Sequence, residues 1–148
     1  MNNHTELING LFDKSDIAAY QCLKELISAS EKDSCVYQFF DTFAEMIDSE
    51  NSYVRTRGLL LIAANAKWDT DYKIDEIIDK YLSNIIDDKP ITSRQCIKAL
   101  PDIAKYKPEL ADDIRAALEK ANPQRYPDSM RSLVNNDISE ALRKINAL

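Results

Sequence analysis

Residues 90–110 read PITSRQCIKALPDIAKYKPEL, a helical pattern with a proline near its middle. Ile97, Leu100 and Ile103 recur at the spacing of one helix face, on both sides of Pro101. A proline inside a helix removes one backbone hydrogen bond and costs about 3 kcal/mol in an ordinary helix. Because the chain has only five prolines and two glycines, this position predicts a helix that bends at residue 101 for an architectural reason.

Three further segments share one apolar pattern, at positions i, i+3, i+4, i+7, i+8 and i+11, which is typical of an amphipathic helix with one buried face. They are VYQFFDTFAEMI at 36–47, IDEIIDKYLSNII at 74–86 and LADDIRAALEKA at 110–121. The second begins 38 residues after the first, and the third begins 36 residues after the second. Only Asp113 breaks the pattern, so the chain is expected to contain a structural repeat.

The segments before these three repeat as well, and short polar breaks join the two halves of each unit. Connections this short predict antiparallel helix pairs, at about 16–48, 52–87 and 91–121. A C-terminal cap is expected at 128–147, and the whole chain, 1–148, is expected to form one domain.

Several residues are predicted to begin helices. Ser34 and Asp71 are candidate N-caps, and a short N-terminal helix is expected to start behind Thr5. Asp137 and Glu140 have the spacing of a capping box, which predicts a helix start there.

A helix-pair period in the upper 30s is typical of α-solenoids. SYVRTRGLLLIAANAKW at 52–68 and the stretch at 90–110 resemble the first helices of HEAT repeats, which tend to open with a hydrophobic–arginine pair and to contain a proline. Val54 and Arg55 provide the opening pair in one copy, and Arg94 and Pro101 provide the arginine and the proline in the other.

The resemblance to HEAT-repeat and armadillo-type α-solenoids, as in small bacterial-type HEAT-like proteins, covers residues 16–121, although the other two first helices lack the proline. It implies an all-α, right-handed α-α superhelix of three antiparallel helix pairs with short helical caps.

The composition, 45% apolar and 30% charged, is typical of a folded domain. No apolar run approaches the roughly 20 residues that span a bilayer, and the N-terminus lacks the features of a secretory signal. Cys22, Cys35 and Cys96 are odd in number and have no C-x-x-C spacing, which favours a reducing compartment. We therefore expect a cytoplasmic protein with no cofactor, no metal and no membrane partner.

The net charge of −6 is unevenly distributed. Residues 1–88 carry 8 Lys/Arg against 17 Asp/Glu, a net of −9, whereas residues 89–131 carry 9 against 6, a net of +3. Affinity for nucleic acid comes largely from neutralised phosphates, so the overall charge disfavours a nucleic-acid partner.

In HEAT-type solenoids the second helix of each pair lines the concave face, which is the usual contact surface. The helical phase predicts nine contact residues on that face: Gln38, Asp41, Glu45, Glu76, Asp79, Lys80, Asp112, Arg115 and Glu119. Six of them are carboxylates, which suggests a protein partner with a basic segment. The alternative is that they form only the solvated side of amphipathic helices.

The sequence offers no Cys–His or Ser–His pair for nucleophilic catalysis, because His4 is the only histidine and lies near the N-terminus. The preferred hypothesis is a noncatalytic protein-interaction or scaffolding module, with self-association through the repeat ends as a second mode of interaction. An alternative is a nucleic-acid-binding protein related to the HEAT-like DNA glycosylases that act on alkylated bases. That family uses aromatic and acidic residues, which Trp68 with Asp69 or Asp71 faintly resembles.

Overall fold

The computed structural model describes residues 3–148, which form eight α-helices, five short 3₁₀-helices and no strand. The α-helices are α1 (Asn3–Gly10), α2 (Asp16–Lys32), α3 (Phe40–Met46), α4 (Ser52–Ala64), α5 (Lys73–Leu82), α6 (Pro90–Tyr106), α7 (Ala111–Lys120) and α8 (Asp128–Asn146). The 3₁₀-helices are η1 (Cys35–Phe39), η2 (Ala66–Trp68), η3 (Ser83–Ile86), η4 (Pro108–Leu110) and η5 (Pro123–Arg125). The expectation of an all-α chain is confirmed for this range.

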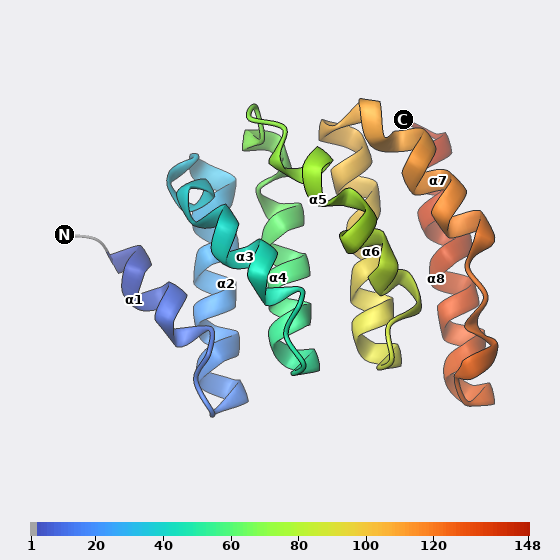
Figure 1. Ribbon diagram of the computed structural model, residues 1–148, viewed down its shortest axis with the longest axis horizontal. Coiled ribbons are helices and arrows are strands. Elements are labelled where there is room, and N and C mark those ends of the chain that lie inside the picture. The colour runs from blue at the N-terminus through green and yellow to red at the C-terminus, as the bar shows by residue number, and fades with distance from the viewer. Residues whose placement is uncertain (1–2) are drawn as a thin grey trace.

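The helices form two layers (Figure 1). One layer contains α2, α4, α6 and α8, which stand side by side and run in the same direction. The other contains α3, α5 and α7, which cross in front of the first layer and run the opposite way, while α1 lies against α2 at the N-terminal end. Helices that lie next to each other within a layer are therefore two elements apart in the α-helix order, as α2 and α4 are.

The core lies between the two layers and is made by the repeated apolar stripes. Among the positions of the shared pattern, Val36, Phe43, Ile74 and Ile114 have no exposed surface. The remaining members are buried or half-buried, except for Asp113, which is exposed. The predicted buried face of these three helices is confirmed.

Gly58 allows α4 to approach α3 closely. A Cβ added at this position would lie 2.8 Å from Met46 Cβ and 2.9 Å from the Phe43 carbonyl oxygen, closer than real Cβ contacts. Across the same core, the buried Tyr81 of α5 donates its hydroxyl to the Leu59 carbonyl at 2.8 Å. These contacts hold the two layers together at α4.

The helix starts differ from the predictions in three places. Ser34 occupies the N-cap position of η1, as predicted, but its side chain makes no capping hydrogen bond. Asp71 is not the N-cap of α5, because Tyr72 occupies that position in a left-handed conformation with φ of 58°. Its neighbour Asp69 caps the helix instead, accepting from the Lys73 N–H through Oδ1 and from the Ile74 N–H through Oδ2 at 2.9 Å each. Finally, α1 begins at Asn3, before Thr5.

The predicted capping box at Asp137 and Glu140 is wrong, because α8 is one continuous helix from Asp128 to Asn146. Asp137 lies in its middle and accepts from Arg94 Nε of α6 at 2.6 Å, so its carboxylate serves helix packing. The α6 helix is uninterrupted from Pro90 to Tyr106 with Pro101 inside it. The bend at residue 101 remains a prediction.

None of the helices between residues 3 and 148 combines the length and the apolar character needed to cross a bilayer.

Candidate functional site

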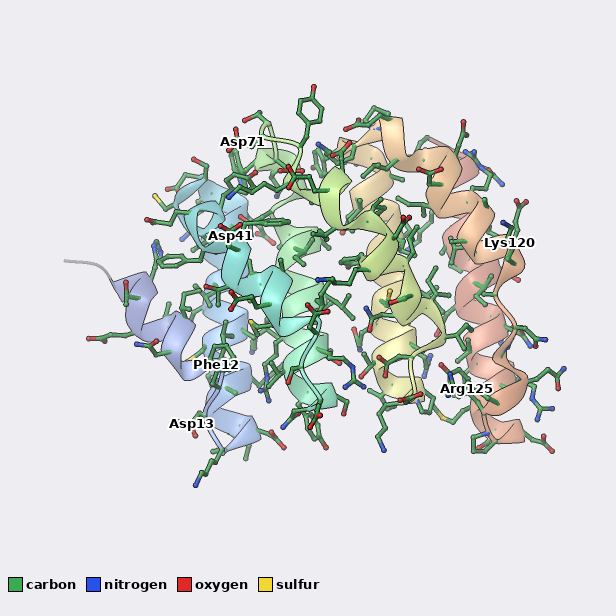
Figure 2. All side chains as sticks on the ribbon, in the orientation of Figure 1. Phe12, Asp13, Asp41, Asp71, Lys120 and Arg125 are labelled. Carbon is green, nitrogen blue, oxygen red and sulfur yellow. The ribbon has the colours of Figure 1, made fainter. Side chains whose placement is uncertain are left out.

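The nine residues predicted for the concave face all lie on the layer of α3, α5 and α7, with Gln38 in the preceding η1. Eight are exposed and Arg115 is half-buried. Figure 2 labels Asp41 on α3. Its carboxylate accepts a hydrogen bond from Lys73 at 3.2 Å. On α7, Arg115 donates to Asp112 at 2.7 Å. The structure thus places these residues on one layer of helices, with all but Arg115 exposed, and their use by a partner remains a prediction.

A different surface is hollowed and apolar. Because Gly58 faces α3, the side chain of Leu60, two positions further along α4, points to the opposite side of the helix. There a cavity of about 630 Å³ opens between three helices of the same layer. It is lined by Asp16, Tyr20 and Leu23 of α2, by Ser52, Tyr53, Thr56, Arg57 and Leu60 of α4, and by Lys89, Ile91, Thr92 and Gln95 at the start of α6. None of the nine predicted residues is among them.

Two smaller hollows of about 220 and 230 Å³ continue this cavity along α4. The first shares Leu60 and Gln95 with the large cavity, and the second shares Ala64 with the first. Together they form a groove, here named the α4 groove, that follows α4 from Tyr53 to its end at Ala64 and continues to Lys67 of η2. At 1.5 Å per residue, the part of the groove along α4, from Tyr53 to Ala64, is about 17 Å long.

The sequence of α4 explains why the groove floor is apolar. The segment 52–68 contains no acidic residue, and its second half, LLLIAA at 59–64, is an unbroken apolar run that covers every side of the helix. Leu61 and Ile62 are buried in the core, whereas Leu60 and Ala64 are half-buried in the groove. A helical stretch that is apolar on all sides is normally covered on all sides, so α4 has a strip, at Leu60 and Ala64, that the described chain leaves partly uncovered.

Exposed apolar side chains gather at the same place. Nine large apolar side chains in the described range are exposed, and four of them line the α4 groove: Tyr20, Tyr53, Ile91 and Tyr106. Tyr53 and Ile91 are each 60% exposed. Single exposed apolar residues are common, but a cluster of them around a hollow is typical of an interaction site.

The polar groups at the wide end of the groove bind one another. Buried Arg57 donates to the Leu11 carbonyl at 3.0 Å and pairs with Asp16 at 3.2 Å. The hydroxyls of Thr56 and Thr92 lie 2.9 Å apart across the floor. The lining contains no cysteine or histidine. This end of the groove is therefore suited to binding an apolar group.

Five lysines surround the groove. Lys67, Lys89 and Lys98 line it, while Lys24 and Lys105 lie 5.5 and 5.2 Å from the ring centroids of Tyr20 and Tyr106. Within residues 3–148 none of these five lysines forms an ion pair, whereas Lys73 and Lys80 of α5 pair with Asp41 and Asp48. The groove thus combines an apolar floor with lysines that form no ion pair in that range, beside the two carboxylates of Glu31 and Asp102.

A buried charge cluster lies at the other end of α6. The Lys107 ammonium contacts Asp75 at 2.8 Å, Asp69 and Glu109 at 3.1 Å each, and the Asp69 carbonyl at 3.0 Å. The Tyr72 ring centroid lies 4.5 Å from the same ammonium. Lys107 is only 3% exposed, and its ammonium joins carboxylates from three segments, so the cluster links η2, α5 and η4.

The pKa values in this cluster follow from its hydrogen bonds. Burial acts to raise the pKa of Asp69, but bonds from Tyr37, Ile74, Lys73 and Lys107 outweigh it and lower the pKa below its usual range. Burial likewise acts to lower the pKa of Lys107, and bonds to Asp75, Glu109 and Asp69 raise it above its usual range. Both groups therefore stay charged at neutral pH.

The residues that suggested a glycosylase have structural partners. Trp68 is half-buried, and its indole N–H donates to the Ser30 carbonyl at 2.7 Å, joining η2 to α2. Asp69 is held in the Lys107 cluster and accepts from the Tyr37 hydroxyl at 2.5 Å. Asp71 is exposed in the turn before α5 (Figure 2). These three residues are therefore not assembled around one cavity.

The sequence pattern did not indicate the groove residues, because the resemblance to HEAT repeats places the contact surface on the second helix of each pair, in the layer of α3, α5 and α7. One signal could have found them: α4 lacks a polar face, although Tyr53 and Leu60 fall at positions that the buried stripe does not use. Ile91 and Tyr106 carry no such signal, because only the packing of α6 beside α4 brings them to the groove.

Within the described range no group of three or more His, Cys, Asp and Glu side chains has the arrangement of a metal site. Comparisons with protein-family models, with curated proteins and with solved structures found no match to this chain.

Proposed function

We propose that this chain is a noncatalytic protein-interaction module that binds a partner protein in the α4 groove. The observation that carries the proposal is the uncovered apolar strip of α4, with four of the nine exposed large apolar side chains around it. The large cavity of about 630 Å³, with the two smaller hollows that continue it along α4, can bury several anchor side chains of a partner.

The proposal includes a HEAT-type solenoid as the architecture: three helix pairs in a right-handed superhelix, α2 with α3, α4 with α5, and α6 with α7, capped by α1 and α8. The repeat of 36–38 residues and the alternation of helices between two layers support it. In this arrangement the acidic row of α3, α5 and α7 is a second candidate surface for a basic segment. The three free cysteines support a cytoplasmic location.

The proposal also includes self-association through an end of the repeat array, and it assigns this contact to the N-terminal end. At the other end, the exposed residues of α8 are mostly polar, including Ser132, Asn135, Asn136, Ser139 and Arg143. A polar outer face is expected of a terminal cap, and it weighs against growth of the array from α8.

The test is affinity capture from the source organism with three forms of the protein. Tyr53→Glu with Ile91→Glu places charges in the groove at two exposed positions, so that folding is preserved. Glu76→Lys with Asp112→Lys is the matched double variant on the acidic layer. We expect one or more proteins to be lost from the groove variant and retained by the acidic-layer variant.

The opposite pattern would assign contact to the acidic row, and capture unchanged by either variant would overturn both surfaces. Duplex DNA is the companion probe for the glycosylase-related alternative. Retardation of duplex DNA that weakens steeply with salt would support that alternative and contradict a purely protein-binding module.

A further inference from the structure

We propose that the occupant of the α4 groove is an acidic amphipathic helix of a partner protein. Its apolar face would lie on α4, and its carboxylates would meet the lysines of the groove walls. This inference rests on the proposed function and names the chemistry of the partner.

The walls of the groove favour a helix over an extended segment. The groove is formed by three helices and by no β-strand, so it offers no strand edge to which an extended peptide could pair. An extended segment buried on the apolar floor would leave its own backbone groups without partners. A helix satisfies most of its backbone groups itself, and the stretch of about 17 Å along α4 holds about 11 residues of helix.

The floor supplies the apolar contact. Leu60 and Ala64 lie one turn apart on α4, with Tyr53 and Ile91 at one end of the groove and Tyr106 at the other. A partner helix with apolar residues at i, i+4, i+7 and i+11 would place one on each turn of this strip.

The walls supply the charge. Lys67, Lys89 and Lys98 line the groove, Lys24 and Lys105 flank it, and none of the five has an ion-pair partner in residues 3–148. The acidic lining residues are Asp16, which Arg57 already neutralises, with Glu31 and Asp102. Among the lining residues, Lys67, Lys89 and Lys98 exceed Glu31 and Asp102 by one positive charge, and Lys24 and Lys105 on the flanks add two more. The groove is thus positive in a chain whose net charge is −6, and a helix with carboxylates on both flanks complements it.

A second copy of this chain fits less well. A symmetric dimer through the groove would bring the same lysines against one another. The acidic layer of another copy has the required charge, but its exposed row is made of polar side chains such as Asp41, Glu76 and Asp112 and offers no apolar stripe.

The experiment uses the full chain and three labelled peptides of one length and one apolar pattern. The flanks of the first carry Glu, those of the second carry Lys, and the third is a scrambled form of the first. Binding is measured by fluorescence anisotropy at two salt concentrations, and helix formation by circular dichroism. We expect the acidic peptide to bind about tenfold or more tightly than the other two, to gain helicity, and to weaken with salt.

A charge reversal makes the test specific. Lys67→Glu with Lys98→Glu changes two groove lysines, and Lys14→Glu with Lys120→Glu is the matched change at exposed lysines that line no part of the groove. The groove variant should prefer the basic peptide, while the control variant should keep the original preference. Equal binding of all three peptides, or an unchanged preference in the groove variant, would overturn the proposal.

Two further outcomes separate this inference from the proposed function. If the groove variant Tyr53→Glu with Ile91→Glu loses a natural partner but the acidic peptide shows no preference, only the assigned chemistry is wrong. If a single-stranded or duplex oligonucleotide displaces the acidic peptide at equal concentration, the positive groove binds nucleic acid and the peptide proposal is overturned.

Discussion

Replacement of Lys107 by methionine tests the physical account of the buried charge cluster. The change keeps a long unbranched side chain but removes an ammonium that contacts three carboxylates, of which Asp69 has no exposed side-chain surface. Removing one partner of a buried ion pair costs about 3–5 kcal/mol. We expect about 3 kcal/mol, the lower end, because Asp69 keeps its bonds from Tyr37, Lys73 and Ile74.

Urea unfolding followed by far-ultraviolet circular dichroism measures the loss. For a chain of this size about 3 kcal/mol corresponds to a melting temperature lower by about 6–12 °C. Lys105→Met is the matched control, since Lys105 lies on the same helix and is exposed, and it should change stability by less than about 0.5 kcal/mol. A loss in Lys107→Met no larger than in Lys105→Met would refute the reasoning.

The pH dependence gives an independent check. Because the folded pKa of Asp69 is lowered, its contribution is fully present above its unfolded pKa and is lost as the pH falls through the folded value. Without the ammonium the folded pKa of Asp69 rises. The stability gap between Lys107→Met and the unchanged protein should therefore be largest near neutral pH and shrink below about pH 4. A gap that grows in acid would contradict this account.

Three other predictions follow from the packing and from the thiols. Gly58→Ala should destabilise the protein by about 1–3 kcal/mol, because the added methyl group forces α3 away from α4; thermal unfolding measures it. Tyr81→Phe should cost about 1 kcal/mol in urea unfolding, since the buried hydroxyl bond to the Leu59 carbonyl is lost. In thiol labelling of the native protein, exposed Cys35 should react, while Cys96, whose pKa burial raises, should react only on unfolding.

Each of these has its own control. Gly10→Ala meets only the side chain of Cys22, which can rotate, so it should cost less than Gly58→Ala; the reverse order would contradict the packing argument. Tyr53→Phe removes a hydroxyl at an exposed position and should leave stability unchanged. Cys35→Ser should abolish the fast labelling phase, and fast labelling of native Cys96 would show that α6 opens locally.

The periodic apolar pattern was enough to predict helices and their buried faces, because a helix is a local structure whose inner positions recur every 3.6 residues. Val36, Ile74 and Ile114 were assigned to the core from spacing alone, and the structure buries all three. Helix starts were less predictable. Tyr72 occupies the N-cap position of α5 in a left-handed conformation, and Asp69 supplies the capping carboxylate that the sequence suggested for Asp71. The capping box at Asp137 failed because this residue lies inside α8, where its carboxylate pairs with Arg94 of another helix.

The sequence by itself determined the all-α character, the apolar core positions and the absence of an acidic residue in segment 52–68. Only the tertiary structure decided where the apolar strip of α4 is left uncovered. That depends on α2 and α6, whose groove residues Tyr20 and Ile91 are more than 30 positions from Tyr53 along the chain. Local spacing says which residues share a helix face, but the coverage of a face is set by neighbours distant in sequence, and so the α4 groove exists only in the packed molecule.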